Sequence, residues 1–190
     1  MLLDILLILL VLANFRLLGS GRLPVCIRMM VIHAFVLGAI PLAIHESHLT
    51  LRLIACSLGT VAVKGILLPW LLRRAARESG TRREVEPLIG FTTSILIGTI
   101  VLGVCFWIVQ PLARGMSPDR GLILAVALFT LLTGLLLIVS RRKALTQVLG
   151  YLAMENGVYA FGAALAVEAP LLMELGVLLD VLVAVFVMGI

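Results

Sequence analysis

The chain has 190 residues, of which 62% are hydrophobic, with a net charge of +5 and a mean hydropathy of +1.22. A soluble domain has only about half apolar residues, so the composition predicts an all-α integral membrane protein. Charged residues are rare and gather at the ends of apolar runs. This clustering is typical of membrane topology signals and argues against a nucleic-acid-binding surface.

Seven apolar runs are each long enough to cross about 30 Å of hydrocarbon at about 1.5 Å per residue, the first only just. The first run lacks the basic start and cleavage site of a signal peptide, so we expect a membrane helix there. The chain ends on apolar residues without a polar cap, and we expect a C-terminal extension beyond it. The sequence predicts an N-terminal part of four helices, 1–120, and a three-helix part, 121–190. The predicted spans are 2–18, 24–44, 50–72, 88–110, 121–140, 144–166 and 170–190.

Basic residues predict the orientation of these helices. The loops after the first, third and fifth predicted helices contain most of the arginine and lysine residues. Because basic loops stay on the cytoplasmic side, we expect the N-terminus outside and the C-terminus in the cytoplasm. The loops placed inside contain Arg16 and Arg22, then five arginines between positions 73 and 83, then Arg141, Arg142 and Lys143.

The stretch 147–160 places Glu155 and Asn156 in the middle of an apolar run. An acid inside a membrane costs about 2.5 kcal/mol or more on insertion scales, so it requires a functional or structural partner. On a helix, Tyr151, Glu155 and Tyr159 share one face, and small residues form a stripe on nearly the opposite face. Such stripes allow two membrane helices to approach closely. The predicted packing stripe is Gly150, Ala153, Gly157, Ala160 and Ala164.

Ionisable groups on four predicted helices fall at one depth, about 12–16 Å from the cytoplasmic ends. Buried groups of these types suit a proton or ion pathway, and the alternative is a set of structural polar pairs. Tyr151 and Tyr159 either donate hydrogen bonds to Glu155 or pack with satisfied hydroxyl groups, and Asn156 can bridge to water. The layer contains His33, Lys64, Glu155 and Asp180, and Glu174 lies nearer the outer face.

Other kinds of site are not indicated. The sequence lacks a phosphate-binding glycine loop, a haem or cluster cysteine pattern and a catalytic triad spacing. His45, Glu46 and His48 have metal-ligand chemistry, but they fall in a short loop where interfacial polar residues are expected. We therefore predict no catalytic, metal or cofactor residues in this chain. The cysteines, Cys26, Cys56 and Cys105, are isolated and are expected to be small buried residues.

Two stretches in the last third of the chain resemble a known family. They are VLGYLAMENGVYAFG at 148–162, which follows three basic residues, and PLLMELGVLLDVLVAVFVMGI at 170–190. They are similar to component E of hydrogenase-4, a membrane subunit of group 4 nickel–iron hydrogenases and formate hydrogenlyases. The likeness is specific around Glu155 and Asn156 and between Glu174 and Asp180.

The predicted helices within 121–190 also resemble, more distantly, subunit K of respiratory complex I and the C component of multisubunit cation/proton antiporters. The basic loop after the first of these helices and the acid in the second agree with that likeness. Relative to the shared Gly150 and Asn156, the complex I protein has its acid one turn earlier, where this chain has Leu152. The acid of the third helix corresponds to Glu174 or to Asp180.

The resemblance implies a non-catalytic subunit in a bacterial or archaeal cytoplasmic membrane. It would link a hydrogenase module to antiporter-like partners and to a partner like the H component of complex I, and help to conduct protons or sodium ions along a hydrophilic axis. The nickel–iron centre and iron–sulfur clusters would belong to partner subunits. The alternatives are a purely structural membrane scaffold in the same kind of complex, or an independent small ion transporter.

Overall fold

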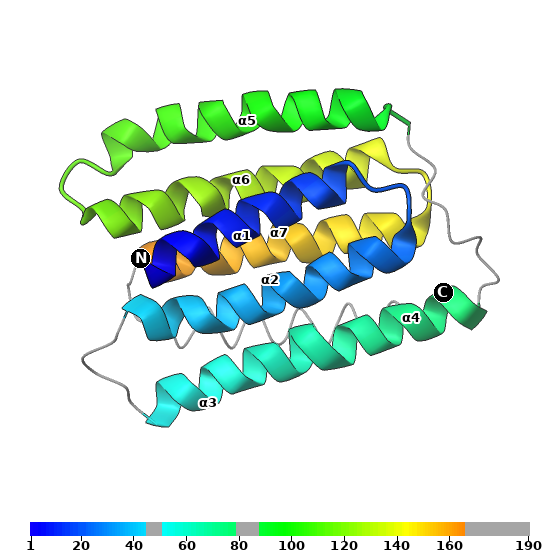
Figure 1. Cartoon of the computed structure of the whole chain (residues 1–190), viewed down its shortest axis with the longest axis horizontal. Coiled ribbons are helices and arrows are strands. Elements are labelled where there is room, and N and C mark those ends of the chain that lie inside the picture. Colours follow the sequence, from blue (N-terminus) through cyan, green and yellow to red (C-terminus); the bar gives the residue numbers. More distant parts are fainter. Residues whose placement is uncertain (45–50, 79–87, 166–190) are drawn as a thin grey trace.

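The computed structural model describes residues 1–44, 51–78 and 88–165, and these are helical apart from short connections. The segments α3, η1 and α4 follow one another without a break and form one long rod (Figure 1). The described residues therefore form six helical rods. In chain order the elements are α1 (Leu2–Leu18), α2 (Leu23–Ile44), α3 (Leu51–Thr60), η1 (Val61–Leu67), α4 (Leu68–Glu78), α5 (Phe91–Leu112), α6 (Pro118–Ser140) and α7 (Ala144–Leu165).

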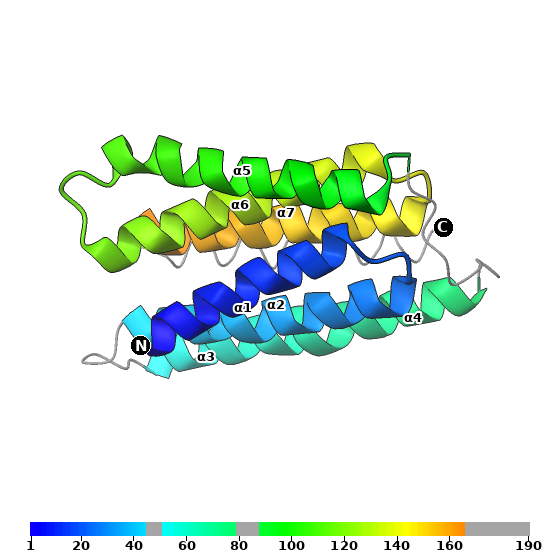
Figure 2. The same cartoon turned by 45° about the horizontal axis from the view of Figure 1, so that its top comes forward.

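The rods run up and down in two layers, which Figure 2 shows from the side. One layer contains α5, α6 and α7, and the other contains α1, α2 and the α3–η1–α4 rod. Among the described elements, α6 and α7 make the most extensive contact, and α2 packs on α1, α7 and η1. The helices α2 and α7 thus bring the two layers together around the middle of the bundle.

Three helices are long and apolar enough to cross a membrane, namely α2 over Leu23–Ala43, α5 and α6. The expected total of seven transmembrane helices is not supported. Helix α1 has 17 residues, the third rod is interrupted by η1, and α7 has polar residues at 147, 155 and 156 that lower its hydropathy. The seventh predicted span, 170–190, lies outside the described residues.

The ends of the helices agree with the predicted boundaries to within three residues, except in the third rod. The predicted span ends at 72, and the helix continues beyond it to Glu78 through residues 73–78, which are rich in arginine and alanine, both strong helix formers. Arg74 lies over the ring of Trp70, 5.8 Å from its centroid, on this extension. The charged continuation therefore carries the rod beyond its apolar part.

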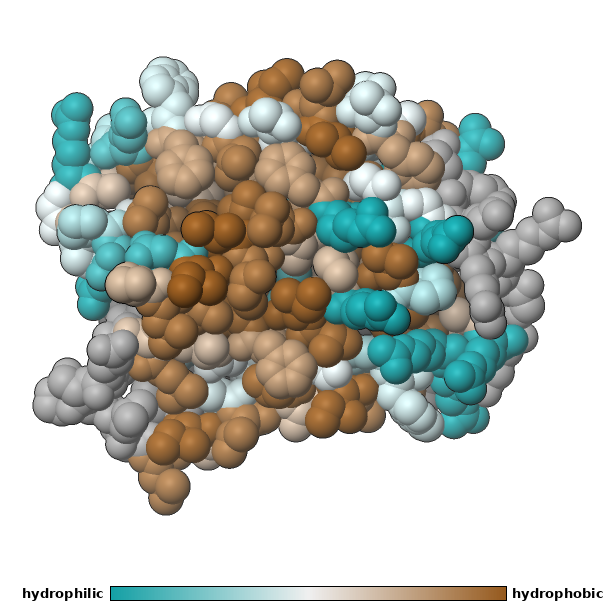
Figure 3. Space-filling view, viewed as in Figure 1, coloured by the Kyte–Doolittle hydropathy of each residue, from teal (hydrophilic) through white to brown (hydrophobic). Residues whose placement is uncertain are grey.

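Charged residues gather at the ends of the bundle. In Figure 3 the surface between the ends is mainly hydrophobic. The C-termini of α1, α4 and α6 lie at one end, together with the 19–22 turn and residues 141–143, and we call this the basic end. Most of the described arginines lie there. Inside the bundle, Cys26 and Cys105 are buried free thiols, and the side chain of Cys56 lies outside the described part of the structure.

Candidate functional site

A buried polar cluster joins η1 to α7. The Lys64 ammonium Nζ lies 2.6 Å from Glu155 Oε1 and donates a second hydrogen bond of 3.3 Å to Asn156 Oδ1. The three residues are 6%, 5% and 4% exposed. Removing both charges from water is expensive, and their mutual attraction offsets this only with good geometry and further hydrogen bonds. Asn156 supplies one of those further bonds.

Local backbone structure sets the position of Lys64. Residues Val61–Leu67 form a π-helical segment, in which the Leu68 N–H donates to the Val63 carbonyl five residues earlier. Short π-helical turns inside α-helices are rare and occur frequently at functional sites. A Cβ atom on Gly38 would lie 2.5 Å from Val61 Cγ2, so the missing side chain lets η1 pack closely on α2. The close contact fixes the height at which Lys64 enters the bundle.

The opposite face of α7 packs tightly on α6. A Cβ atom on Gly157 would lie 2.6 Å from Leu131 Cα, and one on Gly150 would lie 2.9 Å from the Gly134 carbonyl oxygen. These are contacts with backbone atoms, which cannot move aside as a side chain can. Glycine at both positions therefore lets α7 press against α6 while Glu155 points to the other side. The remaining small residues of the stripe, Ala153, Ala160 and Ala164, are also buried.

A small cavity adjoins the cluster. It has a volume of about 10 Å³ and is lined by Lys64 and Asn156 and by apolar side chains of α2, α4 and α7. A space of about this size is the least that can hold one water molecule, which also needs polar partners. Glu155 Oε2 is buried and has no hydrogen-bond partner among the described residues. The ion pair thus has space for one water on the side of Lys64 and Asn156, and Glu155 Oε2 is an acceptor that does not line this space.

The other predicted pathway residues do not all join this cluster. His33 is completely buried on α2, and within the described ranges neither ring nitrogen has a hydrogen-bond partner. Tyr159 is buried in a core of α1, α2, α6 and α7 side chains, and Tyr151 is half-buried against a second core. Glu174, Asp180 and the His45, Glu46 and His48 loop lie outside the described residues.

Sequence reasoning missed a second polar contact between helices. The Asn14 amide Nδ2 donates a 2.8 Å hydrogen bond to Thr130 Oγ1, and the Thr130 hydroxyl donates to the Val126 carbonyl at 2.8 Å. Both Asn14 and Thr130 are completely buried between α1 and α6. An asparagine within the apolar run of α1 was the available signal. Its partner depends on which helices are neighbours, and the sequence does not reveal this.

The sequence predicts that Arg141 belongs to a basic topology signal, and in the structure its side chain is also buried, with 1% exposed. Its Nη2 donates a 2.7 Å hydrogen bond to the Leu18 carbonyl at the C-terminus of α1, and its guanidinium lies 4.9 Å from the centroid of the Phe91 ring. A cation is favourable at a helix C-terminus, where the carbonyl groups lack partners. Burial lowers the pKa of Arg141, but an arginine side chain remains charged in proteins. Arg141 therefore ties α1 and α5 to the α6–α7 connection.

Comparison with known proteins finds relatives along most of the chain. An uncharacterised protein of Mycobacterium tuberculosis is 33% identical over 183 residues, which cover 95% of this chain and 83% of that protein. Hydrogenase-4 component E of Escherichia coli K12 and that of Shigella flexneri are each 36% identical over 137 residues, or 72% of this chain. The match spans 63% of the length of these component E proteins. No family model and no solved structure matches the chain.

Proposed function

Because this chain belongs to the hydrogenase-4 component E family, we propose that it is a membrane subunit of a hydrogenase-type complex that helps to conduct protons or sodium ions. The observation that carries this proposal is the buried cluster of Lys64, Glu155 and Asn156. Ionisable residues inside membrane segments are rare and usually mark ion or proton pathways. The cluster joins the middle of two rods, and it therefore lies far from both ends of the bundle.

The chemistry of the cluster suits a step in proton transfer. A proton that reaches Glu155, for example at Oε2, neutralises the carboxylate and weakens its attraction for the Lys64 ammonium. Loss of the proton restores the ion pair. The adjoining cavity, which Lys64 and Asn156 line, can hold a single water beside the pair. Lys64 lies on a π-helical segment, a kind of turn that is frequent at functional sites.

The proposal extends to the whole predicted axis and its setting. The route would continue from Glu155 through Lys64 and His33, and through Glu174 or Asp180. Residues 121–190 would form a unit like complex I subunit K. Antiporter-like partners, a partner like the H component of complex I and a hydrogenase module, as in formate hydrogenlyase, would hold the remaining path and the metal centres. The setting would be a cytoplasmic membrane, with the N-terminus outside and the basic end in the cytoplasm.

A structural scaffold is the second candidate function, and one observation favours it. The ion pair is closed at 2.6 Å, and the adjoining cavity holds at most about one water. An ion pair in such close contact can have a purely structural role, which is to fix the register of η1 against α7. The two functions differ in whether the charges themselves are required once the helices are assembled.

Neutral substitutions separate these functions. We expect Glu155→Gln to leave the complex assembled and hydrogen chemistry partly intact, while proton uptake into vesicles falls, because an amide cannot take up and release the proton. Assembly is measured by co-purification of the partner subunits. Asp119→Asn is the matched control, because Asp119 is an exposed acid in the first turn of α6. Normal proton uptake by Glu155→Gln would remove Glu155 from the pathway.

The double variant Lys64→Met/Glu155→Gln gives the sharper test. Removing one partner of a buried pair can destabilise a protein by about 3–5 kcal/mol, whereas replacing both is often neutral. If the pair is structural, the double variant assembles and transports ions normally. If the pair conducts, the double variant assembles and still fails to transport, and this is the result we expect.

A further inference from the structure

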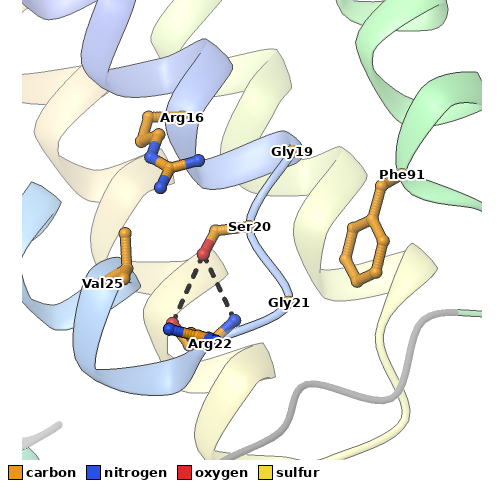
Figure 4. Close-up of a pocket in the computed structure, with 7 residues that line it drawn as sticks. All are labelled: Arg16, Gly19, Ser20, Gly21, Arg22, Val25 and Phe91. Atoms are coloured by element: carbon orange, nitrogen blue, oxygen red, sulfur yellow. Dashed lines mark hydrogen bonds between the residues drawn. The ribbon is translucent and has the colours of Figure 1, made fainter.

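A pocket of about 480 Å³ opens at the basic end of the bundle between α1, α2 and α5. Its volume lies within the roughly 300–1,000 Å³ range of ligand sites. Figure 4 shows Arg16 and Arg22 with Ser20 between them, and Phe91 on the α5 side. The lining consists of Arg16, the turn 19–22, Val25 and Phe91.

The turn that carries Arg22 is fixed by its own hydrogen bonds. Ser20 Oγ is bonded to the Arg22 N–H at 3.2 Å and to the Arg22 carbonyl at 3.4 Å, and Ser20 is buried. Helix α2 begins at Leu23, immediately after this turn, so its N-terminal partial positive charge lies beside the pocket. The backbone therefore holds Arg22 at the pocket before any ligand is bound.

The pocket combines positive charge with few competing groups. Arg16 and Arg22 are both exposed, and within the described part of the chain no carboxylate forms an ion pair with either. A third guanidinium, that of Arg141, lies against the ring of Phe91 and occupies the C-terminus of α1. The negative end of the α1 dipole is thus already neutralised. The two exposed guanidinium groups are suited to a phosphate group, which arginine binds through paired N–H donors.

The surroundings of the pocket suit a lipid. The last turn of α1 and the first turn of α5 border it, and exposed apolar side chains continue from there along the helices, among them Leu12 on α1 and Leu96 on α5. Basic pockets between membrane helices at the cytoplasmic surface are a known way of binding lipid head groups. A head group in the pocket would leave its acyl chains against this apolar surface.

We propose that this pocket binds the phosphate head group of an anionic phospholipid, with Arg16 and Arg22 as its ligands. The site does not depend on ion conduction through the Lys64–Glu155 pair, so each proposal can fail without the other. Lipid held here would bridge α1, α2 and α5 at the basic end, in addition to the 19–22 turn and the hydrogen bond of Arg141 to Leu18.

The test uses the purified full chain in nanodiscs of phosphatidylcholine mixed with an equal amount of phosphatidylglycerol. After extraction into detergent, native mass spectrometry counts the lipids that remain bound. Each arginine near an anionic surface contributes roughly a fivefold factor in binding, so R16Q/R22Q should lower retention of phosphatidylglycerol about twenty-fivefold. The control is R114Q/R120Q, which removes two arginines near the opposite end, and it should retain lipid like the wild type.

A second arm distinguishes a lipid from a free phosphate. Inorganic phosphate, added at a large excess over the lipid, should leave retention of phosphatidylglycerol unchanged, because the acyl chains add binding that phosphate lacks. Displacement of the lipid by inorganic phosphate would overturn the lipid assignment. Equal retention by R16Q/R22Q and the wild type, or equal retention of phosphatidylcholine and phosphatidylglycerol by the wild type, would also overturn it.

Discussion

Glycine is used at the α6–α7 and the α1–α5 interfaces, but it meets different atoms at each. Between α6 and α7, a Cβ atom on Gly157 would lie 2.6 Å from Leu131 Cα, which is backbone. Between α1 and α5, a Cβ atom on Gly98 would lie 2.5 Å from Leu18 Cδ1, which is the far end of a flexible side chain. The first interface is closed by rigid atoms, and the second by atoms that can rotate away.

More open space surrounds the α1–α5 interface than the α6–α7 interface. The pocket of about 480 Å³ lies at one end of the α1–α5 contact, and an apolar groove of about 350 Å³ runs between α1 and α5 farther along. In the most apolar stretch of α5 only 17% of the residues are buried, whereas in that of α6 56% are buried. The rigid interface thus includes the helix that carries Glu155, and the adaptable one borders the pocket proposed for the lipid. Substitutions that add the same atom at each interface test this difference.

The largest effect is expected for Gly157→Ala. The added methyl meets the backbone of Leu131, so α6 and α7 must separate, and overpacking of this kind costs about 1–3 kcal/mol. The gain in helix propensity, about 1 kcal/mol, offsets only part of this. Because the added methyl meets backbone atoms, we expect a cost at the upper end of that range and a net destabilisation of about 2 kcal/mol, measured by thermal unfolding in detergent with circular dichroism. A variant as stable as the wild type would show that the interface is not rigid.

A smaller loss is expected for Arg141→Gln, which removes the contact that ties the two interfaces together. Glutamine is too short to reach the Leu18 carbonyl from the same backbone position, and hydrogen bonds to charged groups contribute about 1.5–3 kcal/mol. The same unfolding measurement should show a destabilisation near the lower end of that range. Arg142→Gln is the control, because Arg142 is exposed, and it should be close to neutral. An equal effect of both substitutions would contradict a structural role for Arg141.

Apolar runs predicted most helix ends, because arginine and proline residues interrupt hydrophobicity where the chain leaves the bundle. The rise per residue also placed Lys64 and Glu155 at one depth. The sequence could not show that they are in contact, since this depends on the order in which the rods pack. The π-helical turn around Lys64 also has no sequence signal, and its close packing on α2 at Gly38 is visible only in the structure.

Arg141 and Asn14 show a different limit. Positive-inside statistics explain an arginine after an apolar run equally well whether it is exposed or buried, so the burial of Arg141 was not predictable. Asn14 was visible as a polar residue in an apolar helix, but its partner Thr130 is 116 residues away in sequence. For both residues, the sequence does not contain the information about which helices are in contact in the folded protein.

The smallest effect is expected for Gly98→Ala, which adds the same methyl group as Gly157→Ala at the adaptable interface. Leu18 Cδ1 must move, and an off-rotamer side chain costs about 0.5–1.5 kcal/mol. The gain in helix propensity is about 1 kcal/mol, so the two contributions nearly cancel. Gly103→Ala on the same helix is the matched control, because no described atom outside its own helix lies within 4 Å of the added Cβ. Since it has the propensity gain without the clash, Gly103→Ala should unfold at a higher temperature than the wild type. The difference between the two α5 variants then measures the strain at Leu18 alone. If Gly98→Ala destabilises the protein as much as Gly157→Ala, the α1–α5 interface is as rigid as the α6–α7 interface, and the contrast between them is wrong.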